Sequence, residues 1–267
     1  MFVTFLSDFG LRDDFAGTCH GVIAQIAPEA RVIDITHGIE PQAVLQGALV
    51  LASTLPYMPQ GVHLAVVDPG VGGRRRAVCV RDREGRLHVG PDNGLLVLAL
   101  ERFGGAEAAW ELTSSEYRLE RVSMTFHGRD VFAPAAAHLA RGVDPSALGP
   151  PLEPRSLVRL EVPEPELGER RLRATVLSAD RFGNVQLNVS REHLERIGIE
   201  VGGRVELERG GERFYALAAR TFADARSGDV ILYEDAYENL ALAITGGSAA
   251  ELLGVRPGEQ LQIAAAG

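Results

Sequence analysis

The sequence predicts an α/β N-terminal domain, with a mostly parallel sheet flanked by helices, followed by a smaller all-β, barrel-like C-terminal domain. Three observations support this fold class. Strand-like and helix-like segments alternate in the first half, prolines cluster between residues 145 and 165, and short strand-like pieces separated by Gly and Asn turns follow. We expect an α/β domain over residues 1–155, a Pro-rich linker over 156–169 and a β-barrel-like domain over 170–267.

The first half alternates between the two kinds of segment in the rhythm of βαβ units. Pro28 stops the first helix, and Pro41 precedes a second helix with apolar spacing. This rhythm implies parallel strands with helices on both faces of the sheet. The expected strands are residues 2–6, 32–35, 62–67 and 77–80, and the expected helices are 16–26, 42–54, 95–103 and 131–139.

The second region shows no helix of normal length. Its apolar pieces are short and recur at the intervals typical of a small barrel or sandwich. The expected strands are residues 172–178, 205–207, 214–218, 230–233 and 240–244.

Composition excludes several classes of function. The net charge of −9 argues against a nucleic-acid partner or an anionic membrane surface. All 27 basic residues are arginine, which excludes a lysine nucleophile or Schiff base. The chain has no signal-like start and no run long enough to span a membrane, and Cys19 and Cys79 lie in apolar surroundings, so we expect a cytoplasmic protein. We expect no cofactor, and no metal, because no HExxH or comparable spacing occurs.

The turn after residues 62–67 carries more chemistry than any other stretch. It reads Asp-Pro-Gly-Val-Gly-Gly-Arg-Arg-Arg from Asp68 to Arg76. The apolar run before it is typical of a strand buried on both faces, so Asp68 lies at a carboxyl strand end, where open α/β sheets bind ligands. Glycines let the backbone approach a ligand closely, and the arginines add three guanidinium groups. We interpret this turn as part of a site.

Other polar residues also lie at strand ends or helix starts. Asp8 ends the first strand and either accepts hydrogen bonds from ribose hydroxyls or caps the next helix; spacing alone leaves both open. For Asp13 and Asp14 we favour a role at the helix dipole. His127, beside Gly128 at a helix entrance, is interpreted as functional, since Asp68 and Arg75 also lie in loops at strand ends. We interpret the following histidines as structural: His37, His63, His88, His138 and His193.

The segment Asp180-Arg181-Phe182-Gly183-Asn184-Val185 interrupts a strand in the second region. It offers a carboxylate, an aromatic face and an amide, which suit a planar base and a cationic amine. A plain β-turn is an equally good interpretation.

Five motifs occur in order over nearly the whole chain: Ser7-Asp8-Phe9-Gly10, the turn from Asp68 to Arg76, Pro91-Asp92-Asn93-Gly94-Leu95-Leu96, Thr125-Phe126-His127-Gly128-Arg129-Asp130 and Phe182-Gly183-Asn184-Val185. Together they resemble the S-adenosylmethionine (SAM) hydroxide adenosyltransferase family, also called SAM hydrolases, which is related to the fluorinase and chlorinase. The resemblance implies a homotrimer that holds SAM between the N-terminal domain of one subunit and the C-terminal domain of the next. It also implies that water displaces methionine from the 5′ carbon, giving adenosine and methionine.

The resemblance implies roles for individual residues. Asp68, Arg75 and His127 look like the water-activating triad, and Asp8 looks like the ribose ligand. Further implied substrate-binding residues are Phe126, Phe182, Asn184 and Phe222 around adenosine, Asp180 at the methionine ammonium, and Tyr233.

The chemistry fits these residue types, because methionine leaves a sulfonium as a neutral thioether and needs no general acid. The protein must orient a water in line with the C–S bond and remove its proton. The sequence leaves open whether Asp68 or His127 takes that proton. Halogenase relatives carry serine at the position of Gly128 and lack the aspartate and histidine, so the resemblance implies a water user. The chain departs from the family pattern at Thr245 and at Ala236-Tyr237-Glu238, which border the methionine tail.

Two rival functions stay open at this point. A metal-dependent nucleotide phosphohydrolase would gather Asp8, Asp13, Asp14 and Asn93 around Mg²⁺ or Mn²⁺. A trimer that binds adenosine or SAM without turnover would not be an enzyme at all.

Overall fold

The computed structural model describes residues 1–266 and divides the chain into two compact units. The N-terminal unit covers Met1–Leu160, and the C-terminal unit begins at Glu161. Among residues 1–266, no helix combines the length and the apolar character that crossing a bilayer requires.

The N-terminal unit is built on a seven-stranded sheet with the order β2-β1-β3-β5-β4-β6-β7. The pairs β2–β1, β1–β3 and β3–β5 are parallel, and β4, β6 and β7 continue the sheet in antiparallel fashion. The strands are β1 (Phe2–Ser7), β2 (Arg31–Thr36), β3 (Gly61–Val66), β4 (Ala77–Asp82), β5 (Leu87–Pro91), β6 (Ala106–Glu111) and β7 (Pro151–Leu152).

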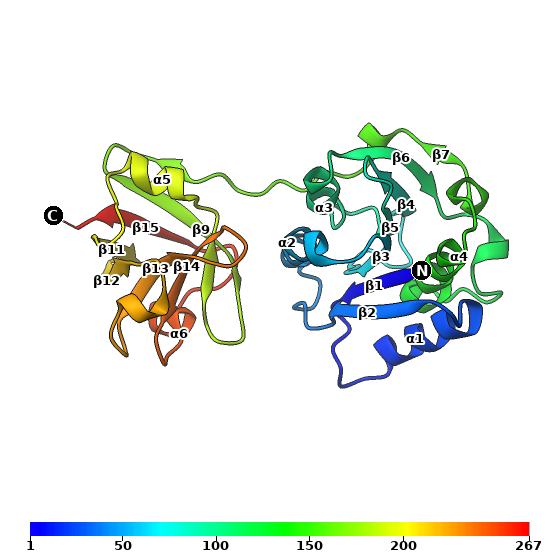
Figure 1. Ribbon diagram of the computed structural model, residues 1–267, viewed down its shortest axis with the longest axis horizontal. Coiled ribbons are helices and arrows are strands. Elements are labelled where there is room, and N and C mark those ends of the chain that lie inside the picture. Colours follow the sequence, from blue (N-terminus) through cyan, green and yellow to red (C-terminus); the bar gives the residue numbers. More distant parts are fainter. Residues whose placement is uncertain (267) are drawn as a thin grey trace. The chain divides into compact units, whose positions relative to one another are not determined.

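Helices cover both faces of this sheet (Figure 1). The helices α1 (Phe15–Ile26) and α4 (Ala133–Ala140) share one apolar core with the sheet, and α2 (Val44–Thr54) and α3 (Val97–Arg102) share the other. Each core is closed by β-branched and leucine side chains from the central strands, as expected for strands buried on both faces. The predicted α/β class is confirmed for this unit.

Three helices begin two residues later than the sequence expectation: α2, α3 and α4. For α2 and α4 the difference has a local cause. The helix expected from residue 42 begins at Val44, because Gln42 adopts a left-handed backbone with φ of 67°. The helix expected at 131–139 is a π-helical turn, Gly128–Phe132, that leads into α4. Pro134 in the first turn of α4 lacks an N–H, which suits a helix start but not a helix interior.

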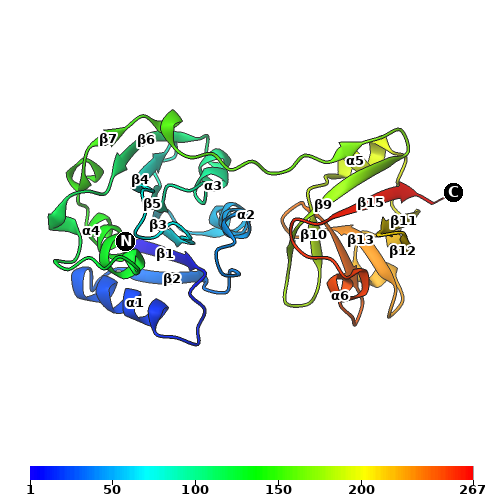
Figure 2. The same cartoon turned by 180° about the vertical axis from the view of Figure 1, so that it is seen from behind.

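The C-terminal unit is a closed β-barrel. The order β10-β14-β13-β12-β11-β15-β9 returns to β10, and β8 adds to the outside of β9. The strands are β8 (Glu166–Leu167), β9 (Arg171–Ala179), β10 (Val185–Leu187), β11 (Arg204–Arg209), β12 (Glu212–Ala218), β13 (Val230–Glu234), β14 (Leu240–Ile244) and β15 (Gln260–Ala265). The two short helices of this unit are α5 (Arg191–Arg196) and α6 (Ala249–Leu253), visible in Figure 2 beside the strands. The predicted all-β, barrel-like class is confirmed.

Both cysteines are buried among apolar side chains, as the sequence suggested. Burial raises the pKa of Cys19 and of Cys79 to about 12, so neither thiol forms a nucleophilic thiolate at neutral pH.

Candidate active site

The guanidinium of Arg75 binds a carboxylate and an imidazole at the same time. Its Nε donates to both carboxylate oxygens of Asp68 at 3.0 Å, and its Nη2 also donates to Oδ2. The same Nη2 lies 2.8 Å from Nδ1 of His127, which is 52 residues further along the chain. The Asp68 and Arg75 side chains are only 6% and 10% exposed, so this ion pair is shielded from solvent. The structure thus brings together the three residues that the sequence singled out.

The turn between β3 and β4 can hold Arg75 over Asp68 because its glycines leave room. Gly72 has φ of 73°, and a Cβ added there would lie 2.1 Å from the carbonyl oxygen of Met124. The Arg75 guanidinium also stacks 5.1 Å from the ring centre of Phe132, in the π-helical turn. Close backbone contact and this cation–π contact fix the guanidinium in place.

The hydrogen bond to Arg75 determines the tautomer of His127. A guanidinium only donates, so Nδ1 must accept and carries no proton. Burial and the positive charge of Arg75 lower the pKa of His127, against the opposing effect of Asp68. The imidazole is therefore neutral near pH 7, and its lone pair on Nδ1 is already used.

Asp8 lies at the end of β1, next to the strand that delivers Asp68. Its Oδ2 accepts the backbone N–H of Gln42 at 2.9 Å, and α1 begins only at Phe15 with Asp14 before it. Asp8 therefore does not cap α1, and the capping alternative raised by the sequence is not observed. Burial raises the pKa of Asp8, and the charge of Asp68 acts in the same direction. The carboxylate is partly desolvated and keeps acceptor capacity for a ligand.

An aromatic group lies beside His127. Phe126 meets Phe9 and Phe15 edge to face, with ring centres 5.7 Å and 5.1 Å apart. A Cβ added at Gly128 would lie 2.7 Å from Cζ of Phe9, so only glycine fits between these rings. The rings form an apolar surface beside His127 that suits contact with a nucleobase, and the Arg129 guanidinium lies 5.0 Å from the Phe126 ring centre.

The segment Pro91-Asp92-Asn93-Gly94 holds the turn from Asp68 to Arg76 in place. Asn93 donates through Nδ2 to the carbonyl of Val67 at 2.8 Å. Asp92 accepts Nε of Arg76 at 2.8 Å and the backbone N–H of Val158 at 2.8 Å. These bonds hold both ends of the Asp68–Arg76 turn against the end of β5.

In the C-terminal unit, the segment from Asp180 to Val185 forms a tight turn with internal bonds. Oδ1 of Asp180 accepts the backbone N–H groups of Phe182 and Asn184, and Oδ2 accepts Nδ2 of Asn184 at 2.8 Å. Phe182 stands out from this turn and is 64% exposed. An exposed ring beside a fixed carboxylate and amide is consistent with both alternatives raised by the sequence.

Phe222 and Tyr233 lie together on the same unit, with ring centres 5.0 Å apart. Burial raises the pKa of Tyr233, and the charges of Asp235 and Asp180 add to this effect. The Asp180 carboxylate is therefore close enough to Tyr233 to affect its ionisation. Tyr233 also lines a cavity of about 460 Å³, together with Glu234 and Arg191.

The predicted site residues thus form two groups, one on each unit. Asp8, Asp68, Arg75, Phe126 and His127 belong to the N-terminal unit. The second group, on the C-terminal unit, consists of Asp180, Phe182, Asn184, Phe222 and Tyr233.

Sequence reasoning missed three contributors to the first group: Gln42, Phe9 and Phe132. A left-handed glutamine has no sequence signature, because such positions favour Gly or Asn. Phe9 lies within a recognised motif and Phe132 within a predicted helix, but only the three-dimensional contacts show that they flank Arg75 and Gly128.

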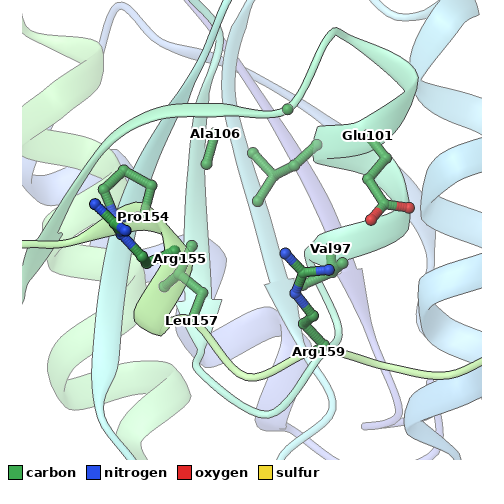
Figure 3. A pocket seen from close by; sticks show the side chains of 9 residues that line it. Val97, Glu101, Ala106, Pro154, Arg155, Leu157 and Arg159 are labelled. Atoms are coloured by element: carbon green, nitrogen blue, oxygen red, sulfur yellow. The ribbon is translucent and has the colours of Figure 1, made fainter.

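A further cavity of the N-terminal unit lies away from these residues. It measures about 310 Å³ and lies between α3 and the segment after β7, where Figure 3 shows Glu101, Arg155 and Arg159 around an apolar floor. None of the predicted site residues lines it. This cavity is therefore separate from the candidate active site.

The phosphohydrolase arrangement is not found in the structure. Asp13 and Asp14 are exposed, and Asp14 accepts the hydroxyl of Thr18. Within residues 1–266, Asp8, Asp13 and Asp14 do not form a cluster with metal-ligating geometry. Asn93, the fourth proposed ligand, is bonded to Val67.

Comparison with known proteins decides the family. Residues 3–149 match the SAM hydroxide adenosyltransferase N-terminal domain, and residues 174–262 match the C-terminal domain. The chain belongs to the SAM hydroxide adenosyltransferase family.

Relatives in this family resemble the chain along nearly its full length. An (R)-S-adenosyl-L-methionine hydrolase of Salinispora arenicola is 47% identical over 98% of this chain and 97% of the relative. A protein of the same name from Thermus thermophilus is 40% identical over 98% of both chains. A fluorinase of Nocardia brasiliensis is 30% identical over 98% of this chain and 96% of its own.

Solved structures share the whole two-unit chain. A crystal structure of an uncharacterized conserved protein from Thermotoga maritima aligns with a TM-score of 0.90 at 32% identity, over 98% of this chain and 99% of that one. A conserved hypothetical protein from Thermus thermophilus aligns with a TM-score of 0.76 at 38% identity, over 99% of both chains.

Proposed function

We propose that the protein is an enzyme that hydrolyses S-adenosyl-L-methionine to adenosine and L-methionine. The observation that carries this proposal is the shared guanidinium of Arg75, bonded to Asp68 and His127 in a chain 47% identical to an (R)-SAM hydrolase. Asp68 supplies a base. Asp8 supplies an acceptor for the ribose hydroxyls, and Phe126 supplies an apolar surface for the nucleobase.

In the proposed reaction, a water oxygen attacks the 5′ carbon in line with the C–S bond. The C–O bond forms as the C–S bond breaks, and the bonding electrons pass to sulfur, which leaves as a neutral thioether. The water proton passes to Asp68, since Nδ1 of His127 is occupied by Arg75. The charge of Arg75 favours the developing hydroxide, and His127 acts as a positioning residue that holds the guanidinium.

The assay uses wild-type protein with the separated (R)- and (S)-sulfonium epimers of SAM in ¹⁸O-water. We expect adenosine and methionine from the (R) form, with the label in the 5′ hydroxyl of adenosine, because the relatives' name specifies that epimer. EDTA should leave the rate unchanged, and ATP should release no phosphate. Absence of adenosine would support the binding-only alternative, and chelator-sensitive phosphate release would support the phosphohydrolase.

The roles of Asp68 and His127 are separated by matched variants. Asp68→Asn should lower kcat by about 10²–10⁴-fold, the usual contribution of a positioned base. His127→Gln keeps an amide oxygen that accepts from Arg75, so it should retain more activity than His127→Ala. If His127→Gln and His127→Ala were both as inactive as Asp68→Asn, acceptance of the Arg75 hydrogen bond would not be enough, and the assignment of His127 as a positioning residue would be wrong.

We further propose a homotrimer whose sites combine the N-terminal unit of one subunit with the C-terminal unit of the next. The two groups of site residues on separate units support this arrangement. Co-expression of Asp68→Asn with Asn184→Ala tests it, since both variants are expected to be inactive alone. Random assembly from equal amounts of the two variants would then give intact sites at about a quarter of all positions, one in each trimer that contains both variants. No recovered activity in mixed trimers would indicate sites formed within one chain.

A further inference from the structure

A second cluster of ligand-type side chains lies at the edge of the N-terminal sheet, outside the proposed catalytic group. His20 projects from α1, and Asp34 and His37 come from the end of β2, which lies beside α1 in both views (Figures 1 and 2). Nε2 of His20 lies 2.8 Å from Oδ1 of Asp34, and Nε2 of His37 lies 3.1 Å from the same oxygen. One ligand atom from each residue lies within 4.8 Å of the other two.

An irregularity in β2 brings Asp34 and His37 together. In a regular strand, residues three apart point to opposite faces. The pairing with β1 shifts here, however, because Phe5 pairs with Asp34 and Leu6 already pairs with Thr36. The extra residue, Ile35, has the effect of a β-bulge, a device that re-aims side chains.

His37 is held rigidly and has one unsatisfied nitrogen. Its ring is 4% exposed, meets Phe5 edge to face at 4.6 Å, and its Nδ1 lies 2.7 Å from Oγ of Ser7. Its Nε2 is buried and makes no hydrogen bond within residues 1–266, since its contact with Asp34 lacks hydrogen-bond geometry. A buried nitrogen without a partner is costly, and this one lies within 4.8 Å of the other two ligand atoms.

We propose that His20, Asp34 and His37 form a binding site for a divalent transition metal ion, with Zn²⁺ as the preferred occupant. Two imidazole nitrogens and one carboxylate oxygen suit Zn²⁺ and disfavour Mg²⁺, which takes oxygen ligands. The half-exposed carboxylate of Asp34 leaves the fourth position open to water. Ser7 supplies the hydroxyl that accepts Nδ1–H of His37, the outer-shell bond usual for a ligating histidine.

Two of the three separations come close to those around this ion after a small adjustment, and the imidazole nitrogens of His20 and His37 lie within 4.8 Å of each other. Ligand atoms about 2.0–2.1 Å from a tetrahedral Zn²⁺ lie roughly 3.3 Å apart. The observed separations of 2.8 Å and 3.1 Å require His20 and Asp34 to spread by a few tenths of an ångström. The His20 and Asp34 side chains are 35% and 45% exposed, so they can make this movement.

The ion would join α1 to β2 next to Ser7, the residue before Asp8. It lies outside the group formed by Asp68, Arg75 and His127, and no step of the proposed hydrolysis uses it. The proposed metal site can therefore be tested independently of the proposed hydrolysis.

The test uses untagged full-length protein, stripped with chelator and dialysed. Zn²⁺ binding is measured by isothermal titration calorimetry, and Co²⁺ is added to a second sample to record its visible d–d bands, whose intensity reports four- or five-fold coordination. The variants are His20→Ala and Asp34→Asn, both at exposed positions. His138→Ala, which removes a half-buried imidazole from another helix, is the matched control.

We expect one equivalent of Zn²⁺ per chain in wild type and in His138→Ala. Affinity should fall by at least about 100-fold in His20→Ala and in Asp34→Asn, because each removes one of three ligands. The thermal midpoint should rise with Zn²⁺ in wild type and in His138→Ala but not in His20→Ala or Asp34→Asn, and Mg²⁺ should give no shift. Substoichiometric binding by wild type, or equal binding by His20→Ala and wild type, would show that the cluster is an ordinary carboxylate–imidazole contact and overturn the proposal.

Discussion

The buried histidine of β3 makes the stability of the N-terminal unit depend on pH. His63 is fully buried, its Nδ1 lies 2.9 Å from Oγ1 of Thr4, and its Nε2 has no hydrogen-bond partner within residues 1–266. Burial, with the nearby His88 and Arg86, lowers the pKa of His63 to about 3. In the unfolded chain the same ring titrates near about 6.5. Between these two values the unfolded state binds a proton that the folded state does not.

Acidification should therefore lower the free energy of unfolding of the N-terminal unit. The contribution of His63 to stability is fully present above pH 6.5 and is lost as the pH falls toward 3. Each pH unit in this window costs about 1.4 kcal/mol, so moving from pH 7.5 to pH 5.0 should cost about 2 kcal/mol from His63 alone. The pKa of the buried His88 is also lowered, so its contribution has the same sign.

The assay is urea unfolding followed by the fluorescence of Trp110, the one tryptophan of the chain, which lies on β6 and so reports the N-terminal unit. His63→Gln removes the titrating ring and keeps an amide near Thr4. Between pH 7.5 and 5.0, the free energy of unfolding should fall by about 2 kcal/mol more in wild type than in His63→Gln. The control His193→Gln, in the other unit, should behave like wild type. Equal losses in wild type and His63→Gln would refute the argument, because they would mean that His63 titrates in the fold as it does in the unfolded chain.

Three further outcomes are expected. Gly128→Ser should displace Phe9, lower the free energy of unfolding by about 1–3 kcal/mol and raise KM for SAM, with partial recovery in the double variant with Phe9→Leu, measured by urea unfolding and steady-state kinetics. Gly72→Ala should abolish most activity, because the new Cβ would meet the Met124 carbonyl at 2.1 Å; near-wild-type kcat would show that the turn can relax. Limited trypsin digestion should cut first within the proposed linker at residues 156–169, for example after the exposed Arg159, and protection of that segment would contradict its role as a linker.

The fold could be predicted from the sequence wherever burial imposed a strong pattern. The apolar segments that became β1 and β3 were recognised because both of their faces are buried. β6 was missed, since its sequence Ala-Glu-Ala-Ala-Trp-Glu carries little β-propensity. β15 carries a signal in the alternation of Leu261 and Ile263, although it is not among the strands expected from the sequence. β10 is too short to carry any pattern.

The candidate site was predictable in its residue types but not in its protonation. Glycines and arginines after a buried strand point to Asp68 and Arg75, the position of His127 beside Gly128 at a helix entrance points to that residue, and the family resemblance implies that the three act together. The assignment of the proton acceptor required the contact between Nη2 of Arg75 and Nδ1 of His127, which no spacing rule provides. The His20, Asp34 and His37 cluster was missed for a similar reason, because it depends on a register shift in β2.

The topology of the sheet explains why a carboxylate and a guanidinium seven residues apart can meet. β4 is antiparallel and lies beyond β5, so the chain leaving β3 must cross the end of β5 before it enters β4. The whole turn therefore stays at the carboxyl edge of the parallel strands, and Arg75 can fold back over Asp68. Just after β5, Asn93 is hydrogen-bonded to Val67 at the start of the turn, and Asp92 is hydrogen-bonded to Arg76 at its end. Asp92 and Asn93 thus fix the position of Asp68 and Arg75 through hydrogen bonds to Arg76 and Val67, without hydrogen bonds of their own to either residue of the ion pair.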